Sequence, residues 1–238
     1  MNCRIDTTKC QFTTIINNKC NKMNIWFIII AVMVLSFIVQ HMLQSRFNKY
    51  SKVGLPSGMS GAEVAQKMLH DHGIYNVKVV PTRGMLTDHF NPQTMTVALC
   101  EGVYGSRSVA AAAVAAHECG HAVQHATHYA PLQLRNAIVP ATRIGSQLSP
   151  FLLLAGLFLG WQPLVELGII LFSLAALFQL VTLPVEYNAS KRALATLSSG
   201  LLTAEETNGA ARVLDAAALT YVAALLTSIA QLLRRILL

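Results

Sequence analysis

The sequence predicts a mainly α-helical, multi-pass membrane protein that carries a small β-sheet. The mean hydropathy is +0.47 and only 12% of the residues are charged, which is low for a soluble protein. Three long apolar runs, at 25–39, 151–183 and 214–233, supply enough hydrophobic length for spanning helices. Two short segments, 74–80 and 94–100, have the composition or the alternating polarity of strands, and they predict the sheet.

The net charge of +7 is distributed in a way that indicates a membrane surface rather than nucleic acid. Lysine and arginine are scattered beside the apolar runs, and no basic helix or aromatic-rich basic strand is visible. The five cysteines show no C-x-x-C spacing, so the sequence predicts neither a disulfide framework nor a cysteine zinc site. We therefore expect the lipid bilayer as a partner, and no nucleic acid.

The N-terminal part predicts an extension followed by a membrane anchor. Residues 1–22 are rich in Asn, Thr and Lys, which predicts a disordered N-terminal extension. Residues 23–43 predict an N-terminal transmembrane helix with about 19 residues of apolar length. A cleaved signal peptide is the alternative, but no small-residue cleavage site follows Val39. Since Met23 directly precedes the apolar run, translation from Met23 is a further hypothesis.

The next elements are short. Ser60 and Glu63 have the spacing of a capping box, so we expect a helix that begins there and ends near Gly73. The strand that follows should stop at Pro81. The strand at 94–100 should be half-buried, because its residues alternate in polarity.

The sequence His117-Glu118-Cys119-Gly120-His121 reads H-E-x-x-H and lies late in an alanine-rich run that predicts a helix. His117 and His121 are then one turn apart on one face, where two imidazoles can hold Zn²⁺ at roughly 2.0–2.1 Å. Glu118 beside them can accept a proton from water held at the metal. The alternative is a surface helix with two histidines, but such a helix should carry Lys and Glu on its other faces, where this one carries Ala.

Neighbouring histidines and the cysteine of the motif have simpler interpretations. His125 continues the register of the motif, but it lies roughly 12 Å along the helix axis from His117, too far to share one metal ion. We interpret His125 and His128 as helix-end residues. His89 is interpreted as a loop residue, with a role beside the substrate or behind a metal ligand as the alternative. Cys119 points away from the histidine face and is interpreted as a small core residue.

The C-terminal half predicts further membrane helices. Residues 150–183 predict a transmembrane helical hairpin with its tip near Gly160. Glu166 lies close to that tip, where it can reach lipid headgroups; a buried functional carboxylate is the alternative. Residues 184–210 predict a separate helical region, and 211–238 predict a C-terminal apolar helix that either spans the membrane or packs along it.

A catalytic zinc ion needs a third protein ligand and one position that stays open for water. A hairpin returns the chain to the side from which it entered, so the segment after Pro184 should lie on the same side as His117. Glu186 is the first carboxylate of that segment, and a helical first turn would hold its side chain in place. We therefore predict Glu186 as the third ligand, with a glutamate that only complements the helix dipole as the alternative.

Several sequence blocks carry a resemblance to a known family: L-T-D-H-F-N-P at 86–92, H-E-C-G-H-A-V-Q at 117–124, L-P-V-E-Y-N-A-S-K-R-A-L-A at 183–195 and A-A-A-L-T-Y-V-A-A at 216–224. From about residue 25 to its end, the chain resembles the neutral zinc metallopeptidase family of bacterial membrane proteins (YugP-like). The third block also resembles the E-x-x-A-D helix of membrane gluzincins. Glu186 then falls on the metal-binding Glu and Ala189 on the Ala, whereas Ser190 stands where those proteases have Asp.

The resemblance implies a zincin-like metallopeptidase core in the catalytic region 44–149, and a zinc-dependent membrane metalloendopeptidase that acts on a protein or peptide. His117, His121 and Glu186 would hold Zn²⁺, and Glu118 would be the general base. By analogy with zincins, the strand at 94–100 would pair with an extended substrate. The candidates for oxyanion stabilisation, or for support behind the ligands, are His89, Tyr187, Asn188 and Arg192.

Two other classes of function are less compatible with the sequence. A non-catalytic membrane scaffold or chaperone-like protein with a structural or vestigial metal site would usually close the metal with four ligands, often cysteines. A metal transporter would need several ionisable residues inside the spans, and the hairpin has only Glu166. Basic residues near the predicted spans favour a cell-membrane protein whose catalytic side is cytoplasmic, although Arg234 and Arg235 oppose this if the last helix spans.

Overall fold

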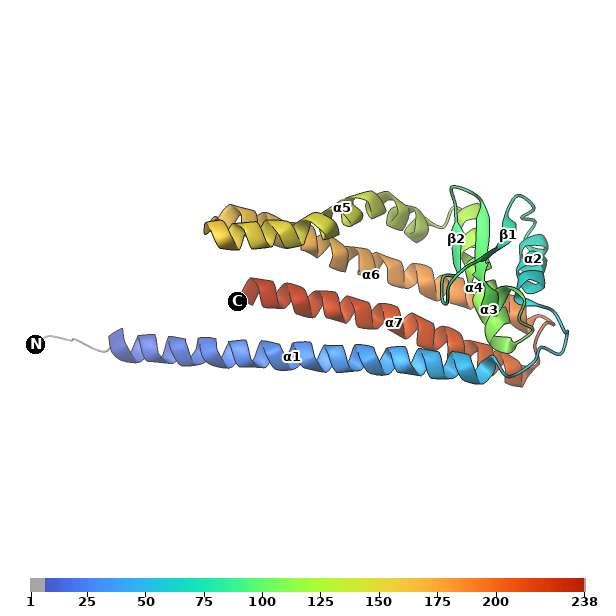
Figure 1. Cartoon of the computed structure of the whole chain (residues 1–238), viewed down its shortest axis with the longest axis horizontal. Coiled ribbons are helices and arrows are strands. Elements are labelled where there is room, and N and C mark those ends of the chain that lie inside the picture. Colours follow the sequence, from blue (N-terminus) through green and yellow to red (C-terminus); the bar gives the residue numbers. More distant parts are fainter. Residues whose placement is uncertain (1–6, 238) are drawn as a thin grey trace, which may run out of the picture.

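Four long helices and a compact group of short elements make up the protein in the computed structural model, which describes residues 7–237 and the side chains of residues 26–234. The long helices are α1 (Thr7–Tyr50), α5 (Ala130–Leu159), α6 (Gln162–Ser198) and α7 (Ala204–Leu237). The short elements are α2 (Gly61–Asp71), β1 (Lys78–Thr82), β2 (His89–Asn91), β3 (Thr96–Cys100), α3 (Glu101–Tyr104) and α4 (Val109–Ala126). Figure 1 shows the long helices running side by side, with the short elements gathered at one end of them.

Each of the four long helices contains a stretch that is long and apolar enough to cross a membrane. Large apolar side chains cover their outer faces; Phe37 is 72% exposed and Phe158 is 86% exposed. A lipid layer accommodates such surfaces, whereas water does not. The predicted mainly α, multi-pass architecture with a small sheet is therefore confirmed.

The last helix, α7, runs antiparallel to α1 along most of its length (Figure 1). The hydroxyls of Ser36 and Thr227 lie 3.3 Å apart between them, and the Arg234 guanidinium lies over the Trp26 ring at 5.7 Å. The C-terminal apolar helix thus lies alongside α1, and it is a fourth candidate for a membrane span.

The disorder expected for residues 1–22 is wrong for residues 7–22, because α1 begins at Thr7. No proline or glycine occurs between Thr7 and Tyr50, so nothing stops a helix nucleated in the apolar part from propagating in both directions. The transmembrane helix predicted at 23–43 is the middle of this longer helix. Residues 1–6 lie outside the described part of the chain.

The sheet has the order β1-β3-β2, with β1 parallel and β2 antiparallel to β3. Two expectations need correction. Pro81 lies inside β1 rather than ending it, because β1 is an edge strand, where a missing N–H is tolerated. The strand predicted at 94–100 is the central one, and consecutive residues from Val97 to Cys100 are buried, so both of its faces are covered there rather than one.

The element α4 is the centre of the packing. Ser108 caps its first turn by accepting a hydrogen bond from the Ala111 N–H, and most of its alanines are buried. Small side chains let α2, α6 and α7 approach closely. The helix α2 begins with the predicted capping box of Ser60 and Glu63, and Gly73, with φ +70°, follows its end.

The predicted hairpin is present, but its arms are longer than 150–183. The helix α5 ends at Gly160 in the left-handed conformation, with φ 62°. The helix α6 continues through Pro184 to Ser198, so the region expected as a separate element from residue 184 is the continuation of the hairpin helix. A proline inside a long helix removes one N–H···O bond and clashes locally, and packing against neighbouring helices compensates for this.

Candidate metal centre

Three donor atoms converge where α4 meets α6. Glu186 Oε2 lies 3.2 Å from His117 Nε2 and 3.5 Å from His121 Nε2. The ligand atoms of the three residues all lie within 4.8 Å of one another. The Glu186 side chain is only 3% exposed, and the two imidazoles are 13% and 11% exposed. The structure thus brings together the three residues that the sequence predicted as metal ligands.

The close approach of the two helices depends on Gly120, the second variable residue of the H-E-x-x-H motif. A Cβ atom at this position would lie 2.7 Å from the Ala189 carbonyl oxygen on α6. Ala189 is itself fully buried. Small residues on both helices therefore bring Glu186 within reach of the two histidines.

We expect Gly120→Val to separate α4 from α6, to lower zinc occupancy and to destabilise the protein by about 1–3 kcal/mol through overpacking. Thermal unfolding and zinc content of the detergent-purified variant measure both effects. The matched control is Gly102→Val in α3, where an added Cβ meets no atom within 4 Å. Equal effects of the two substitutions would contradict the proposed role of the helix contact.

The second nitrogen of each imidazole has a partner. His121 Nδ1 lies 3.0 Å from Gln124 Oε1, and the Gln124 Nε2 donates to the Val185 carbonyl at 2.7 Å. This orientation of the amide makes Gln124 Oε1 an acceptor, so Nδ1 of His121 carries a proton and Nε2 is the nitrogen that is left to bind a metal ion. His117 Nδ1 lies 3.1 Å from the Ser190 hydroxyl. Ser190 therefore contacts the nitrogen of His117 that faces away from Glu186.

We expect Ser190→Ala to weaken zinc affinity by about tenfold or more, because orienting partners of metal-binding histidines typically contribute 10–100-fold. Competition with a chromogenic chelator measures the change. Ser198→Ala, at an exposed serine of the same helix, is the control. An unchanged affinity in Ser190→Ala would show that the serine does not orient His117.

A cavity of about 250 Å³ opens beside the three donors. Glu118 lines it together with residues from β2, α5 and α7. Two lining residues, Arg135 and Tyr221, lie next to Glu186 and were missed by sequence reasoning. Arg135 Nη1 lies 3.5 Å from Glu186 Oε1, and its Nε is buried without a partner. The Tyr221 side chain lies beside Glu186. The only sequence signal for either residue is a polar group inside an apolar helix.

The donor set fits a zinc ion. Two imidazole nitrogens and one carboxylate oxygen are the ligands of many catalytic zinc sites, and the cavity leaves one side open. Among the described residues, no further His, Cys, Asp or Glu joins this group, so they do not form a closed four-ligand site. Burial disfavours the charged form of His121, yet hydrogen bonds with Glu186 and Gln124 and the charge of Glu118 raise its pKa overall.

Of the remaining candidates from the sequence, one lines the cavity and three do not. His89 lies on β2, not in a loop, and lines the cavity with Nδ1 2.8 Å from the Thr87 carbonyl oxygen. Asn188 accepts hydrogen bonds from Gln124 and from Arg192. The two candidates Asn188 and Arg192 therefore lie behind the ligands. Tyr187 is 69% exposed and does not line the cavity.

The other residues of the motif region behave as expected. His125 lies in the last turn of α4, its ring 5.8 Å from that of Phe90, and His128 follows the end of the helix. Cys119 is fully buried, and burial strongly raises the pKa of its thiol. Its Sγ lies 3.5 Å from the Ala65 carbonyl oxygen, on the face opposite the donors. The interpretation of Cys119 as a small core residue is confirmed.

A helix with two histidines and a glutamate, completed by a glutamate from a second helix, is the donor arrangement of zinc metallopeptidases, here within a bundle of membrane-type helices. The chain belongs to the family described as "Putative neutral zinc metallopeptidase", whose sequence model matches residues 25–238. It is similar to a protein of Bacillus subtilis (strain 168) named "Putative membrane protease YugP". The two are 51% identical over 209 residues, which cover 87% of this chain and 93% of that protein. No solved structure matches the chain.

Proposed function

We propose that this protein is a zinc-dependent membrane metallopeptidase that hydrolyses peptide bonds, with Glu118 as the general base. The observation that supports this proposal most is the convergence of His117, His121 and Glu186 on one wall of a cavity that Glu118 also lines. A structural metal site would not need an open coordination side. It also would not need a carboxylate, such as that of Glu118, that lines the cavity without being one of the metal ligands.

Metal binding, proton transfer and orientation of the ligands are assigned to different residues. His117, His121 and Glu186 would hold Zn²⁺, which when bound lowers the pKa of a coordinated water toward ~7 and polarises the substrate carbonyl. Glu118 takes the proton of the attacking water and passes it to the leaving amine. Gln124 and Ser190 keep the two imidazoles oriented during this cycle.

Stabilisation of the developing oxyanion is assigned to donors that line the cavity. Of the four sequence candidates, His89 alone does so. Arg135 and Tyr221 line it as well, and they replace Tyr187, Asn188 and Arg192 in this role. A guanidinium and a phenol can both donate a hydrogen bond to an oxyanion.

The substrate is proposed to pair with β2, not with the strand expected from the sequence. That strand, β3, is bonded on one side to β1 and on the other to β2, so it has no free edge. The strand β2 is an edge strand, and His89 and Phe90 on it line the cavity. An extended peptide added to β2 would therefore pass the metal centre.

The direct test is hydrolysis of a peptide mixture by zinc-loaded protein in detergent, read as new termini by mass spectrometry. Removal of the metal with a chelator should abolish cleavage, and added Zn²⁺ should restore it. A zinc-loaded protein that generates no new termini would favour the non-catalytic scaffold with a metal site.

We also propose that the metal centre faces the cytoplasm. Basic residues are more frequent at the end of the long helices that carries the centre: Arg46, Lys49, Lys52, Lys191, Arg192 and Arg212. The opposite end has Arg234 and Arg235, and the segment 7–22 adds Lys9, Lys19 and Lys22.

A cysteine introduced at exposed Gln93, in a variant without Cys3, Cys10 and Cys20, should therefore resist a membrane-impermeant maleimide added to intact cells. It should react after the cells are opened. The remaining Cys100 and Cys119 are buried and should not interfere. Labelling of intact cells would reverse the proposed orientation.

A further inference from the structure

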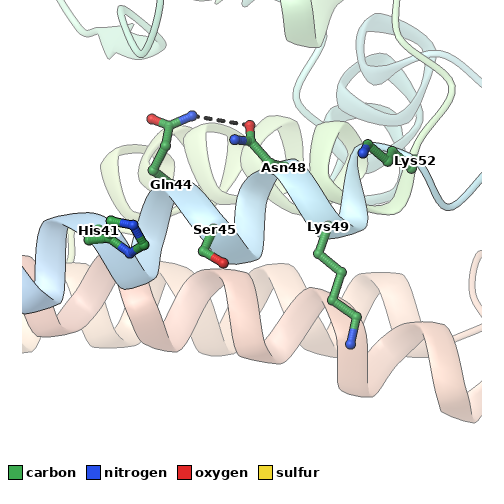
Figure 2. A pocket seen from close by; sticks show the side chains of 6 residues that line it. All are labelled: His41, Gln44, Ser45, Asn48, Lys49 and Lys52. Carbon is green, nitrogen blue, oxygen red and sulfur yellow. Dashed lines mark hydrogen bonds between the residues drawn. The ribbon is translucent and has the colours of Figure 1, made fainter.

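The metal centre lies at the level where the apolar part of the helices ends. Arg46 Nη1 donates to the Arg212 carbonyl at 3.0 Å, and Ser36 contacts Thr227. Tyr221 lies between Arg212 and Thr227 on α7, so it is level with about residue 40 of α1. The apolar run of α1 ends at this point. Figure 2 shows the polar and basic side chains that follow it, from His41 to Lys52.

The length of α6 independently indicates the same depth for the metal centre. Gln162 at its start and Glu186 at the metal centre are about 36 Å apart along the helix, slightly more than the roughly 30 Å of a hydrocarbon core. With the hairpin tip at one membrane face, Glu186 lies at the other face. The candidate active site is therefore at the membrane surface rather than far out in the water.

A second cavity lies between the first half of α5 and α6, next to the metal cavity on the side of the hairpin tip, and we treat the two cavities together as one cleft. One face of α5 carries Leu132, Arg135 and Asn136, which line the metal cavity. The next turns of the same face line a second cavity of about 290 Å³ with α6; its walls include Val139, Thr142, Arg143, Ser146, Phe178 and Gln179. The spacing of three and four residues places both cavities along one stripe of α5.

The cleft is confined to this half of the hairpin. Toward the tip, small residues bring α5 and α6 into direct contact. Ser149 donates to the Gly168 carbonyl at 2.8 Å, and a Cβ atom on Gly145 would lie 3.1 Å from the Leu171 carbonyl oxygen. On Gly156 it would lie 2.8 Å from the Val165 nitrogen. The two helices are therefore in close contact from about the middle of the layer to the tip, and both cavities lie on the other side of this contact, toward the metal centre.

The walls of the cleft have an unusual composition for this depth. Arg143 lies about 12 Å further along α5 than Arg135, toward the hairpin tip. Polar groups at such depth are costly in lipid unless they meet a polar partner. An extended peptide that enters the layer needs hydrogen-bond partners for its N–H and C=O groups. Arg143 and Gln179 supply groups of that kind. The hydroxyls of Thr142 and Ser146 donate to carbonyls within α5, and their oxygens can still accept a hydrogen bond.

From this geometry we infer that the substrates are polypeptides anchored in the membrane and cut next to their anchor. The cleft between α5 and α6 receives the unwound segment that joins the anchor to the scissile bond. This inference rests on the peptidase function proposed above. It identifies the substrate class, and it gives Arg143 and Gln179 a role in binding this class without a role in the chemistry.

The experiment uses zinc-loaded protein in proteoliposomes and three forms of one cleavable sequence. That sequence, taken from the peptide mixture, is presented as a free peptide, directly after a single transmembrane helix, or behind a long Gly/Ser linker on the same helix. The variants are Arg143→Leu, Arg143→Lys and Gln179→Leu. The control is Gln147→Leu, at an exposed position of α5 that does not line the cleft.

We expect wild type to cut the directly anchored form with a kcat/KM about tenfold or more above that of the linker form. Arg143→Leu and Gln179→Leu should lose most of this preference and keep the activity on free peptide. Arg143→Lys should retain part of it, and the control should behave as wild type.

Other results overturn the inference in distinguishable ways. Equal cleavage of all three forms, or an equal effect of the cleft variants on all three, would leave a peptidase without a preference for anchored substrates. Loss of co-purified phospholipid in the cleft variants with unchanged cleavage would make the cleft a lipid site. Absence of cleavage of every form by zinc-loaded protein would contradict the peptidase function itself.

Discussion

Glu118→Gln is expected to abolish most hydrolysis and to leave zinc binding intact. Glutamine has nearly the same shape as glutamate but cannot take up the proton of the attacking water. General bases of this kind contribute about 10²–10⁴-fold, so kcat/KM should fall by that factor. Zinc should stay bound, because Glu118 lines the cavity but is not among the three grouped donors. Peptide cleavage and zinc content are measured on the same preparation.

The control for this substitution is Glu101→Gln, which makes the same change at an exposed position in the first turn of α3. It should hydrolyse as wild type does. If Glu118→Gln retained full activity with zinc bound, the general base would have to be another residue. If it lost zinc, the separation of ligands and base described above would be wrong.

Glu186→Ala is expected to have the largest effect on the metal. It removes the single carboxylate donor and leaves two imidazoles, which bind zinc weakly at one site. It also leaves the Arg135 guanidinium beside the donors without its ion-pair partner, and a cation there repels Zn²⁺. We expect a loss of zinc affinity greater than the 10–100-fold typical of groups that only orient a ligand.

Chelator competition measures this affinity, and Glu166→Ala is the matched control. Glu166 lies on the same helix but is exposed near the hairpin tip, so its removal should leave zinc binding unchanged. Full zinc affinity in Glu186→Ala would place the third ligand elsewhere in the chain. A comparable loss in Glu166→Ala would indicate a general disturbance of α6.

The donor residues were predictable because each has a local signal. The H-E-x-x-H spacing defines a helix face by itself, and Glu186 follows from the return of the hairpin to its starting side. The capping box at Ser60 is a local signal of the same kind. The residues that complete the cavity have no such signal. Arg135 and Tyr221 reach Glu186 only because of the register in which α5, α6 and α7 pack.

The errors in the predicted elements have a common cause. The strand β2 has only three residues and forms because it pairs with β3. It is too short to show an alternating pattern in the sequence. Pro81 and Pro184 are breakers in a local reading, but an edge strand and a packed helix tolerate them. The helix at residues 7–22 has weak local propensity and continues an apolar helix that is already nucleated. In each case tertiary context overrides the local pattern.

The central claim is a zinc centre with two histidine ligands and one glutamate ligand. The most direct test is zinc K-edge X-ray absorption on detergent-purified protein that has been loaded with one equivalent of zinc. We expect a first shell of nitrogen and oxygen at about 2.0–2.2 Å, with the outer scattering of two imidazoles and no sulfur. A sulfur shell near 2.3 Å, or scattering from one imidazole or none, would contradict the site built from His117, His121 and Glu186.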